Sequence, residues 1–298
     1  MIITGKKFSK PDLSRVINGD TELPEEAKTE EKIRLDHLLV EQHPEYNRSS
    51  LQTFIRSGFV TVDGVVVTKP NTKILPEATL GLTVPKREQE IAHPPVIYED
   101  EHVIVLNKPA GLLSMAKGEY CPEPTLEDYG LLVHRLDRDT SGVVILAKDA
   151  ETQKMLRKQF QDRKTHKTYY AVTDGQPKLD EALIDLPIAR NLKHPTTFIV
   201  DQNGKSSQTY YKVIEKAGKR ALIELKPTTG RTHQLRVHLR YLGTPIAGDR
   251  VYNTESKAPR LIFHAGELEI TIPGENGGER KTFRAEVPAE FREYLGKS

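Results

Sequence analysis

The first hydrophobic pattern covers residues 33–85 and predicts two short helices followed by a hairpin. RLDHLLVE has its leucines on one face of a helix, and SSLQTFIRSG has a second apolar stripe at the same spacing. Ser49 and Gln52 fit a capping box at the start of the second helix, and Gly58 fits the left-handed residue that ends it. β-Branched residues flank the Asp-Gly pair in VTVDGVVV, which predicts a tight turn between two strands.

The pattern changes beyond residue 92, where strand-like runs dominate. VIYEDEHVIVLNK contains two extended apolar pieces, and GVVILAK, TYYAVT, QTYYKVIEK and ALIELKP are further runs of this kind. Helical spacing appears in AETQKMLRKQFQDR and in THQLRVHLRYLG, where the leucines of the second run, including Leu242, are expected to face inward. Because helices and strands do not alternate regularly, we expect an α+β fold with a mixed, mainly antiparallel sheet, preceded by the small N-terminal α/β unit.

These patterns divide the 298 residues into a polar tail at 1–31, a small domain at 32–86 and a large domain at 92–298, joined by a short polar linker. Hydrophobic residues make up 37% of the chain, which is enough for a folded core, and a net charge of +2 neither favours nor excludes a nucleic-acid partner. Cys121 is the single cysteine, so an internal disulfide and a thiolate zinc site are excluded. The sequence has no apolar run of membrane-spanning length and no apolar leader, and we expect a soluble cytoplasmic protein.

Two loops carry candidate chemistry. Asp137 lies in HRLDRDTSG between the apolar runs LLV and VVIL, where it either caps a turn or serves a functional site at the edge of a sheet. Arg231 follows a strand in TTGRTHQLR and is placed to meet an anion, either a carboxylate of the same protein or a ligand phosphate. His233 and His238 lack the helical spacing of a zinc pair, so structural or RNA-contacting roles are expected.

The stretch from Lys148 to Tyr170 is locally basic and ends in two tyrosines. Such a stretch is either a solvated helix face or a nucleic-acid surface, with phosphates on the cations and a base stacked on a ring. Phosphate-binding GxxxxGK[ST], dinucleotide-binding GxGxxG and nucleophile-elbow GxSxG motifs are missing from the sequence. Energy-coupled, redox and hydrolase functions therefore lose their usual support.

Several separated motifs together resemble the RluA family of RNA pseudouridine synthases. Along the chain they are NKPAGLL, HRLDRDTSGVVILAKD, KTYYAV, TGRTHQLRVHLRYLGTPIAGDRVY and RLIFHAGELEITIP. This is also their order in the family. The resemblance runs from about residue 92 to the end. RLDHLL and SSLQTFIRSGFVTVDG resemble the small S4-type RNA-binding domain, which often precedes this catalytic domain in synthases that act on large-subunit ribosomal RNA.

The resemblance implies roles for individual residues. Asp137 is the catalytic carboxylate, Arg231 pairs with it and keeps it ionised, and Tyr169 stacks on the target base and can assist removal of the proton on carbon 5. Arg135 fills the stack that the target base leaves when it flips out. Further RNA contacts are expected from Arg48, Arg56, Lys167, His233 and Arg236.

The expected activity is isomerisation of uridine to pseudouridine in structured RNA, which needs no metal and no cofactor. Ribosomal RNA is favoured as the substrate because an S4-like unit suits a large structured RNA. The same chemistry on transfer RNA, or a non-catalytic RNA-binding or ribosome-assembly factor, are the alternatives. Whether Asp137 attacks the sugar, attacks the base or removes the ribose 2′ proton stays open, and we expect a monomer without an obligate protein partner.

Overall fold

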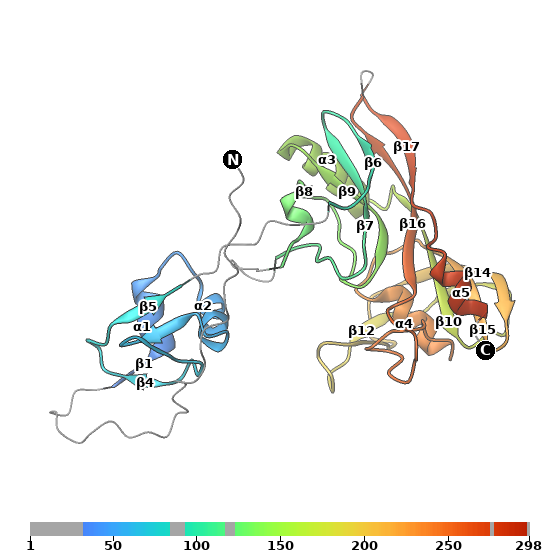
Figure 1. Ribbon diagram of the computed structural model, residues 1–298. Helices are drawn as coiled ribbons and strands as arrows, with labels where there is room; N and C mark the ends of the chain where they lie inside the picture. The colour runs from blue at the N-terminus through green and yellow to red at the C-terminus, as the bar shows by residue number, and fades with distance from the viewer. Residues whose placement is uncertain (1–31, 84–92, 117–122, 275–276, 297–298) are drawn as a thin grey trace, which may run out of the picture. The chain divides into compact units, whose positions relative to one another are not determined.

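The computed structural model describes residues 32–83, 93–116, 123–274 and 277–296 (Figure 1). The chain divides into two compact units, one formed mainly by its N-terminal part and one by residues 91–115 and 124–298. Each unit is described by itself. The predicted tail at 1–31, the linker at 86–92 and Cys121 lie outside the described residues, as do the exact borders between the domains.

The N-terminal unit packs two helices against short strands. The elements are β1 (Ile33–Arg34), α1 (Leu35–Gln42), α2 (Arg48–Arg56), β2 (Val60–Val62), β3 (Val65–Val66), β4 (Lys73–Ile74) and β5 (Leu80–Leu82). β1 pairs with β4, and β3, β2 and β5 form an antiparallel sheet in that order. The apolar stripes predicted for both helices supply the core, since Leu35, Leu39, Leu51, Phe54 and Ile55 are fully buried.

The turns of this unit follow the sequence, but one helix cap does not. Gly58 ends α2 with φ +79°, and both residues of the Asp63–Gly64 turn between β2 and β3 have positive φ, which confirms the two turn predictions. The predicted capping box is wrong. Asn47 caps α2 by accepting a hydrogen bond from the Ser50 amide at 3.0 Å, while Gln52 donates to the buried carboxylate of Asp36.

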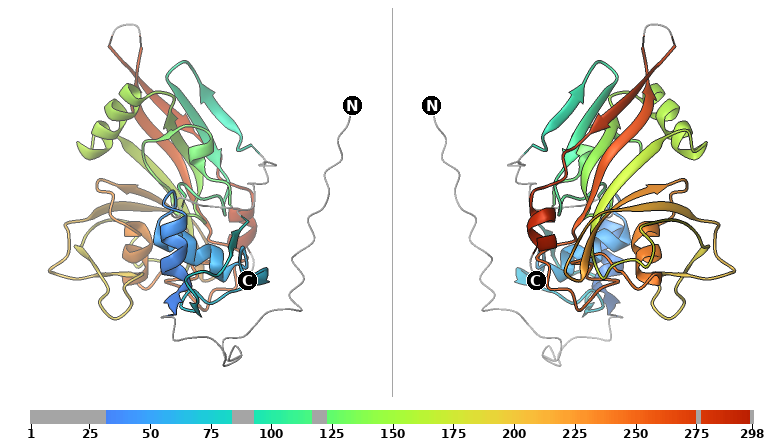
Figure 2. Two further views of the ribbon diagram at one scale, coloured as in Figure 1. Left: turned by 90° about the vertical axis from the view of Figure 1, so that its left-hand side faces the viewer. Right: turned by 90° about the vertical axis from the view of Figure 1, so that its right-hand side faces the viewer.

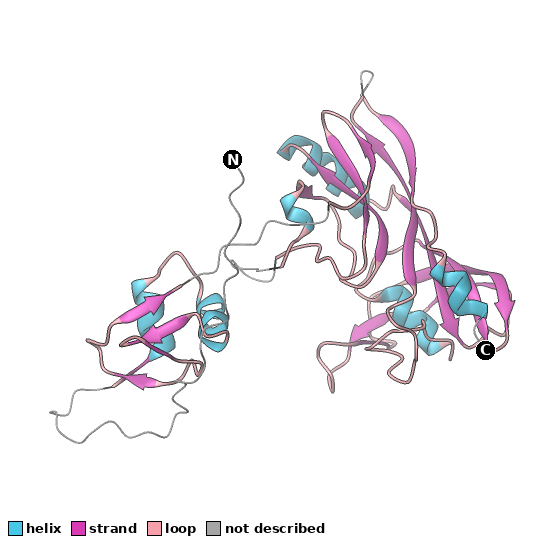
Figure 3. Cartoon of the chain, viewed as in Figure 1, coloured by secondary structure: helices cyan, strands magenta, loops and turns pink. Residues whose placement is uncertain are grey.

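The second unit is built on one large sheet (Figure 3). The strands of this unit are β6 (Val96–Glu99), β7 (Val103–Lys108), β8 (Leu131–Leu132), β9 (Ser141–Ala147), β10 (His166–Asp174), β11 (Glu181–Asp185), β12 (Ile188–Arg190), β13 (Phe198–Val200), β14 (Gln208–Ala217), β15 (Arg220–Pro227), β16 (Phe263–Ile272) and β17 (Glu279–Arg284). The sheet order is β11-β14-β15-β10-β16-β9-β7-β6, with β17 on β16 and β8 on β9, and β12–β13 is a separate hairpin. Only the β9–β16 pairing is parallel among these described strands, so the mixed, mainly antiparallel sheet is confirmed.

Helices cover this sheet in different places. They are η2 (Leu126–Asp128), α3 (Ala150–Gln161), α4 (Gln234–Tyr241) and α5 (Glu290–Gly296). Both views of Figure 2, read with the labels of Figure 1, show α3 and α4 toward opposite ends of the sheet. Leu156 of α3 packs with Val105 and Ile145, whereas Leu235 and Leu239 of α4 pack in a second apolar cluster.

Two predictions for α4 need correction. The run THQLRVHLRYLG predicts a helix from Thr232, but the helix begins at Gln234, because His233 takes a left-handed conformation with φ +56° and cannot belong to the helix. Leu242, which was expected to face inward, follows the last helical turn and is 38% exposed. In the part of the chain that the structure describes, no helix has the length and apolar character needed to cross a membrane.

The sheet brings distant loops together. The loop that carries Asp137 runs directly into β9, and the loop that carries Arg231 joins β15 to α4. β10 and β16 lie between β15 and β9 in the sheet, so these loops border a common space over the central strands. Loop side chains held by a rigid sheet are a frequent setting for function.

Candidate active site

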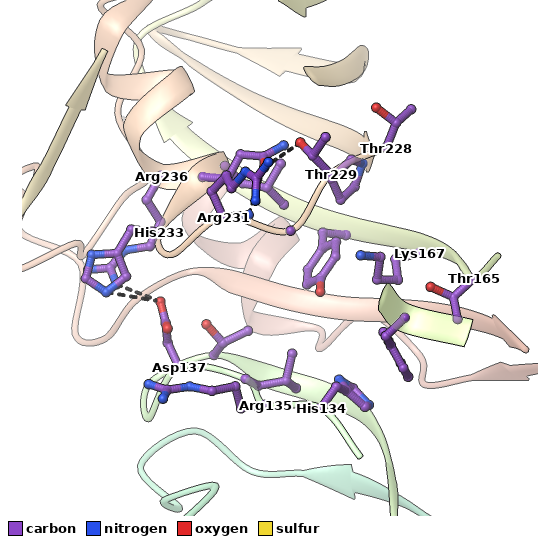
Figure 4. Close-up of a pocket in the computed structure, with 18 of the residues that line it drawn as sticks. His134, Arg135, Asp137, Thr165, Lys167, Thr228, Thr229, Arg231, His233 and Arg236 are labelled. Carbon is purple, nitrogen blue, oxygen red and sulfur yellow. Dashed lines mark hydrogen bonds and ion pairs between the residues drawn. The ribbon is translucent and has the colours of Figure 1, made fainter. Parts of the chain in front are cut away.

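A pocket of about 460 Å³ opens between these loops (Figure 4). This volume lies within the range of small-ligand sites. The walls come from residues 134–140 before β9, from the start of β10 at 165–169, from the loop at 227–231 and from the start of α4. In Figure 4 Asp137 points toward His233 and Arg236, while Lys167 and Thr165 lie farther along the pocket.

Asp137 is held by Arg236 and not by Arg231. Arg236 Nη1 donates to Asp137 Oδ2 at 2.8 Å, and the same guanidinium makes two 2.7 Å bonds to the two oxygens of Asp249. Asp249 is fully buried and Arg236 nearly so. Burial opposes the charged form of each group, but the hydrogen bonds and opposite charges of the pair prevail, so the pKa of Asp249 is lowered and that of Arg236 is raised. Arg236 therefore serves as a bridge from the buried carboxylate of Asp249 to the carboxylate of Asp137.

Two predictions about the arginines change accordingly. Arg231 lies in the pocket wall, but its Nε donates to the carbonyl of Ser206 at 3.2 Å, so the predicted ion pair with Asp137 is wrong. Arg231 lies in the loop before the helix, whereas Arg236 lies in the first turns of α4 and faces Asp137. Arg236 was also predicted to contact RNA. Instead it is buried, and its nitrogens bind the carboxylates of Asp137 and Asp249.

His233 is the second neighbour of Asp137. Its Nε2 lies 3.7 Å from Asp137 Oδ2, and its Nδ1 is 2.8 Å from the hydroxyl of Tyr252. Burial lowers the pKa of His233, and the Arg236 guanidinium acts in the same direction. The imidazole is therefore neutral at pH 7, and the direct RNA contact expected of it stays a prediction.

Tyr169 forms part of the pocket beside Asp137. Its ring is stacked on Phe263 with centroids 5.3 Å apart. Burial raises the pKa of the Tyr169 phenol well above its ordinary value, and the negative charge of Asp137 adds to the effect. The hydroxyl stays protonated at neutral pH, so this side chain is suited to packing against a base and is a poor proton acceptor.

Two residues that we predicted to contact RNA, Arg135 and Lys167, also line the pocket. Arg135 is exposed at its mouth, where Nη1 lies 3.9 Å from the sulfur of Met115. Lys167 is half-buried, its Nζ lies 6.0 Å from the centroid of the Phe160 ring, and burial lowers its pKa. Both positions suit contact with RNA, and both assignments stay predictions.

The loop that carries Asp137 is fixed by two residues that sequence reasoning did not single out. Lys108 is fully buried, and its Nζ donates to the carbonyls of Pro109, Leu112 and Arg138 at 2.8–2.9 Å. Three acceptors match the three hydrogens of an ammonium group, although burial lowers the Lys108 pKa to about 7. His134 Nε2 accepts from the Ile145 amide, and burial lowers its pKa to about 3.

The signal for these residues was present but not interpretable by itself. Lys108 stands in NKPAG, directly after an apolar strand, where a lysine is ordinarily exposed. Only the fold shows that the chain closes over it with carbonyl oxygens from two loops.

In the N-terminal unit, Asp36 arranges the basic residues. Its fully buried carboxylate accepts from Arg34 at 2.9 Å, from Arg48 at 2.9 Å and from Gln52 at 2.7 Å, and the hydrogen bonds to these side chains hold its pKa well below the usual range. Arg48 and Arg56 both have exposed side chains. Their expected contacts with RNA stay predictions.

Within the described ranges, no group of three or more His, Cys, Asp or Glu side chains has the arrangement of a metal site. The pocket combines one carboxylate, an arginine that orients it, a neutral histidine and a partly buried tyrosine.

Comparisons with known proteins identify the family of both units. Residues 102–241 match the family model for RNA pseudouridylate synthase, and residues 33–80 match the S4 domain. Ribosomal large subunit pseudouridine synthase D of Nitrosomonas europaea is 33% identical, over 98% of this chain and 93% of that protein.

Two more relatives cover the larger unit. The dual-specificity RNA pseudouridine synthase RluA of Salmonella typhimurium is 42% identical over 66% of this chain and 93% of its own length. The solved structure of human RNA pseudouridylate synthase domain containing 1 superposes with a TM-score of 0.56 at 27% identity, covering 68% of this chain and 86% of that one. The chain belongs to the RluA-type RNA pseudouridine synthases and carries an S4 RNA-binding domain ahead of the catalytic one.

Proposed function

We propose that this enzyme isomerises a specific uridine of large-subunit ribosomal RNA and that Asp137 is its catalytic residue. One relative that matches 98% of this chain, S4 domain included, is named for that substrate. The observation that carries the catalytic assignment is the carboxylate of Asp137, oriented by Arg236 in a pocket that also holds Tyr169.

The reaction breaks the bond between N1 of uracil and C1′ of ribose and joins C5 to C1′. C5 loses its hydrogen as a proton and N1 gains a proton, so no redox cofactor is needed. Uracil is a poor leaving group, and an ionised carboxylate beside the sugar and base provides either a nucleophile or a base for this exchange. The Arg236 guanidinium places a positive charge beside Asp137 and orients its carboxylate by donating a hydrogen bond to Oδ2 at 2.8 Å.

The base must leave the RNA stack to reach Asp137. Extruding a nucleotide costs on the order of a few kcal/mol and costs least in loops. Arg135, exposed at the mouth of the pocket, is our candidate for the side chain that occupies the vacated position. Tyr169 provides a ring for the uracil to pack against, and its raised pKa argues for this contact over removal of the C5 proton.

Release of tritium from RNA labelled at uracil C5 tests this proposal, because forming the C–C bond expels that hydrogen. Transcripts of large-subunit ribosomal RNA and of transfer RNA are compared with the wild type and with Asp137→Asn. We expect release from the ribosomal transcript only and none with the variant, whose thermal unfolding and RNA affinity stay near wild type.

Two results would contradict the proposal. Release from transfer RNA would change the substrate. Appreciable release by Asp137→Asn would remove the catalytic role from this carboxylate.

A further inference from the structure

Two hydrogen bonds and one longer polar contact connect a strand outside the main sheet to Asp137. The Phe198 amide on β13 donates to the Tyr252 hydroxyl oxygen at 2.9 Å, and that hydroxyl lies 2.8 Å from His233 Nδ1. The other ring nitrogen of His233, Nε2, lies 3.7 Å from Asp137 Oδ2. Tyr252 also borders a second cavity, of about 760 Å³, on the side of the β12–β13 hairpin.

These contacts lead us to assign the proton of His233 to one of its two ring nitrogens. Because the Tyr252 oxygen already accepts from the Phe198 amide, its own O–H is available to donate to His233 Nδ1. A neutral imidazole that accepts at Nδ1 carries its hydrogen on Nε2, the nitrogen that faces Asp137. The lowered pKa of His233 agrees with a neutral ring.

The His233 ring is held from several sides at a conformational cost. Its backbone is left-handed with φ +56°, a conformation that non-glycine residues adopt rarely and that often marks function. Phe198 and Tyr252 contact the imidazole edge-on, with centroids 5.7 Å and 5.5 Å away. The Arg236 guanidinium lies 5.1 Å from the centroid of the Tyr252 ring, so the two neighbours of Asp137 share one support.

We propose that Tyr252 and His233 form a positioning relay for Asp137, in which Tyr252 fixes His233 as the Nε2–H tautomer and His233 holds Oδ2 in place beside Arg236. This inference rests on the proposed catalytic role of Asp137. Arg236 and His233 both approach Oδ2, so Oδ1 is the oxygen left to meet the reacting atom. His233 and Tyr252 are thus positioning residues, and neither needs to touch the uridine.

The first test reads the tautomer without RNA. Full-length protein labelled with ¹⁵N in histidine is examined by long-range ¹H–¹⁵N correlation at pH 7.5, and the resonances of His233 are assigned by their loss in His233→Asn, a residue that tolerates the left-handed backbone. We expect an unprotonated Nδ1 and a protonated Nε2. In Tyr252→Phe, which keeps the ring and loses the hydroxyl, this preference should disappear.

The second test reads the chemistry under single-turnover conditions. Tyr252→Phe should lower the rate at saturating enzyme by about tenfold, as expected for a reacting group held less well, and leave the half-saturating concentration within about twofold. The double variant Tyr252→Phe/His233→Asn should be no slower than His233→Asn, because both changes act through one contact to Asp137. Tyr210→Phe is the matched control, since it removes a 2.7 Å hydrogen bond to Glu181 at the far edge of the sheet.

The outcomes separate the relay from the function on which it rests. An Nδ1–H tautomer of His233, or one that Tyr252→Phe leaves unchanged, overturns the relay even if the RNA chosen proves not to be the substrate. Equal single-turnover rates for Tyr252→Phe and wild type overturn it while the synthase activity stands. A loss of rate that is additive in the double variant, accompanied by a lower Tm, also contradicts it by assigning Tyr252 a merely structural role.

Discussion

Replacing Arg236 by methionine tests two roles of this side chain: neutralising the buried charge of Asp249 and orienting Asp137. Met keeps much of the aliphatic volume and removes all three hydrogen bonds, to Asp137 at 2.8 Å and to Asp249 at 2.7 Å twice. Asp249 is fully buried, with 0% accessible surface. Without Arg236 its negative charge would remain buried with no counterion. Removing one partner of a buried pair costs about 3–5 kcal/mol.

For a unit of about 200 residues, each kcal/mol lowers Tm by about 2–4 °C. Arg236→Met should therefore lower the Tm of the catalytic unit by about 6–20 °C and abolish pseudouridine formation, because Asp137 also loses the group that orients it. Thermal unfolding and tritium release measure the two effects. Arg284→Met is the matched control, since Arg284 is 67% exposed in its pair with Glu267 and should cost less than about 1 kcal/mol.

A second substitution separates charge from packing. In Arg236→Met/Asp249→Asn the uncompensated charge is gone, and the Asn oxygen can still accept from the Val251 and Tyr252 amides. This double variant should regain much of the lost stability and stay inactive. If Arg236→Met lies within about 1 kcal/mol of wild type, the buried pair does not carry the stability assigned to it here.

Three further predictions concern buried groups around the site. Burial lowers the pKa of His134 to about 3 and of His264 to about 4 from an ordinary 6.5, so the unfolded chain binds protons first as pH falls. As the pH is lowered from 6.5, the free energy of unfolding should therefore decrease by about 1.4 kcal/mol per pH unit for each histidine. His264→Gln should reduce this pH dependence by the contribution of one histidine when the free energy is measured by urea unfolding at several pH values. An unchanged pH dependence would refute the prediction. Lys108→Met leaves three carbonyls without their donor and should lower the free energy of unfolding by at least about 3 kcal/mol and abolish activity. The control Lys212→Met, at an exposed position, should change the free energy of unfolding by less than about 0.5 kcal/mol. Equal losses would contradict the role of Lys108 in fixing the loop. Tyr169→Phe keeps the ring, and its single-turnover rate should stay within about tenfold of wild type. The rate of Tyr169→Leu should be about 10–100-fold lower than that of Tyr169→Phe. The reverse order would indicate that the hydroxyl takes part in the reaction.

Local elements of this protein were predictable because neighbouring residues decide them. The Asp63–Gly64 turn and the left-handed Gly58 depend on backbone preferences that act over a few residues. The Asn47 cap shows the limit of such reasoning. Ser49 and Gln52 had the right spacing for a capping box, but Gln52 was drawn to the buried carboxylate of Asp36, sixteen residues away.

The arginine that pairs with Asp137 could not be predicted from neighbouring residues in the same way. Arg231 and Arg236 stand five residues apart in one motif, and both are plausible partners for a carboxylate. Arg236 lies 99 residues from Asp137 along the chain, and the choice depends on where α4 begins and which way its first turns face. His233 decides that start by taking a left-handed conformation.

The sequence by itself determined the mixed, mainly antiparallel architecture, the S4-type unit and the family, because periodicity, turn residues and motif order are local properties that survive without coordinates. Only the tertiary structure decided which groups meet. The parallel pairing of β9 with β16, the closure of carbonyls around Lys108 and the contacts of Asp137 with Arg236 and His233 join residues far apart in the chain. Such contacts depend on how whole elements pack, and that information is distributed over the entire core.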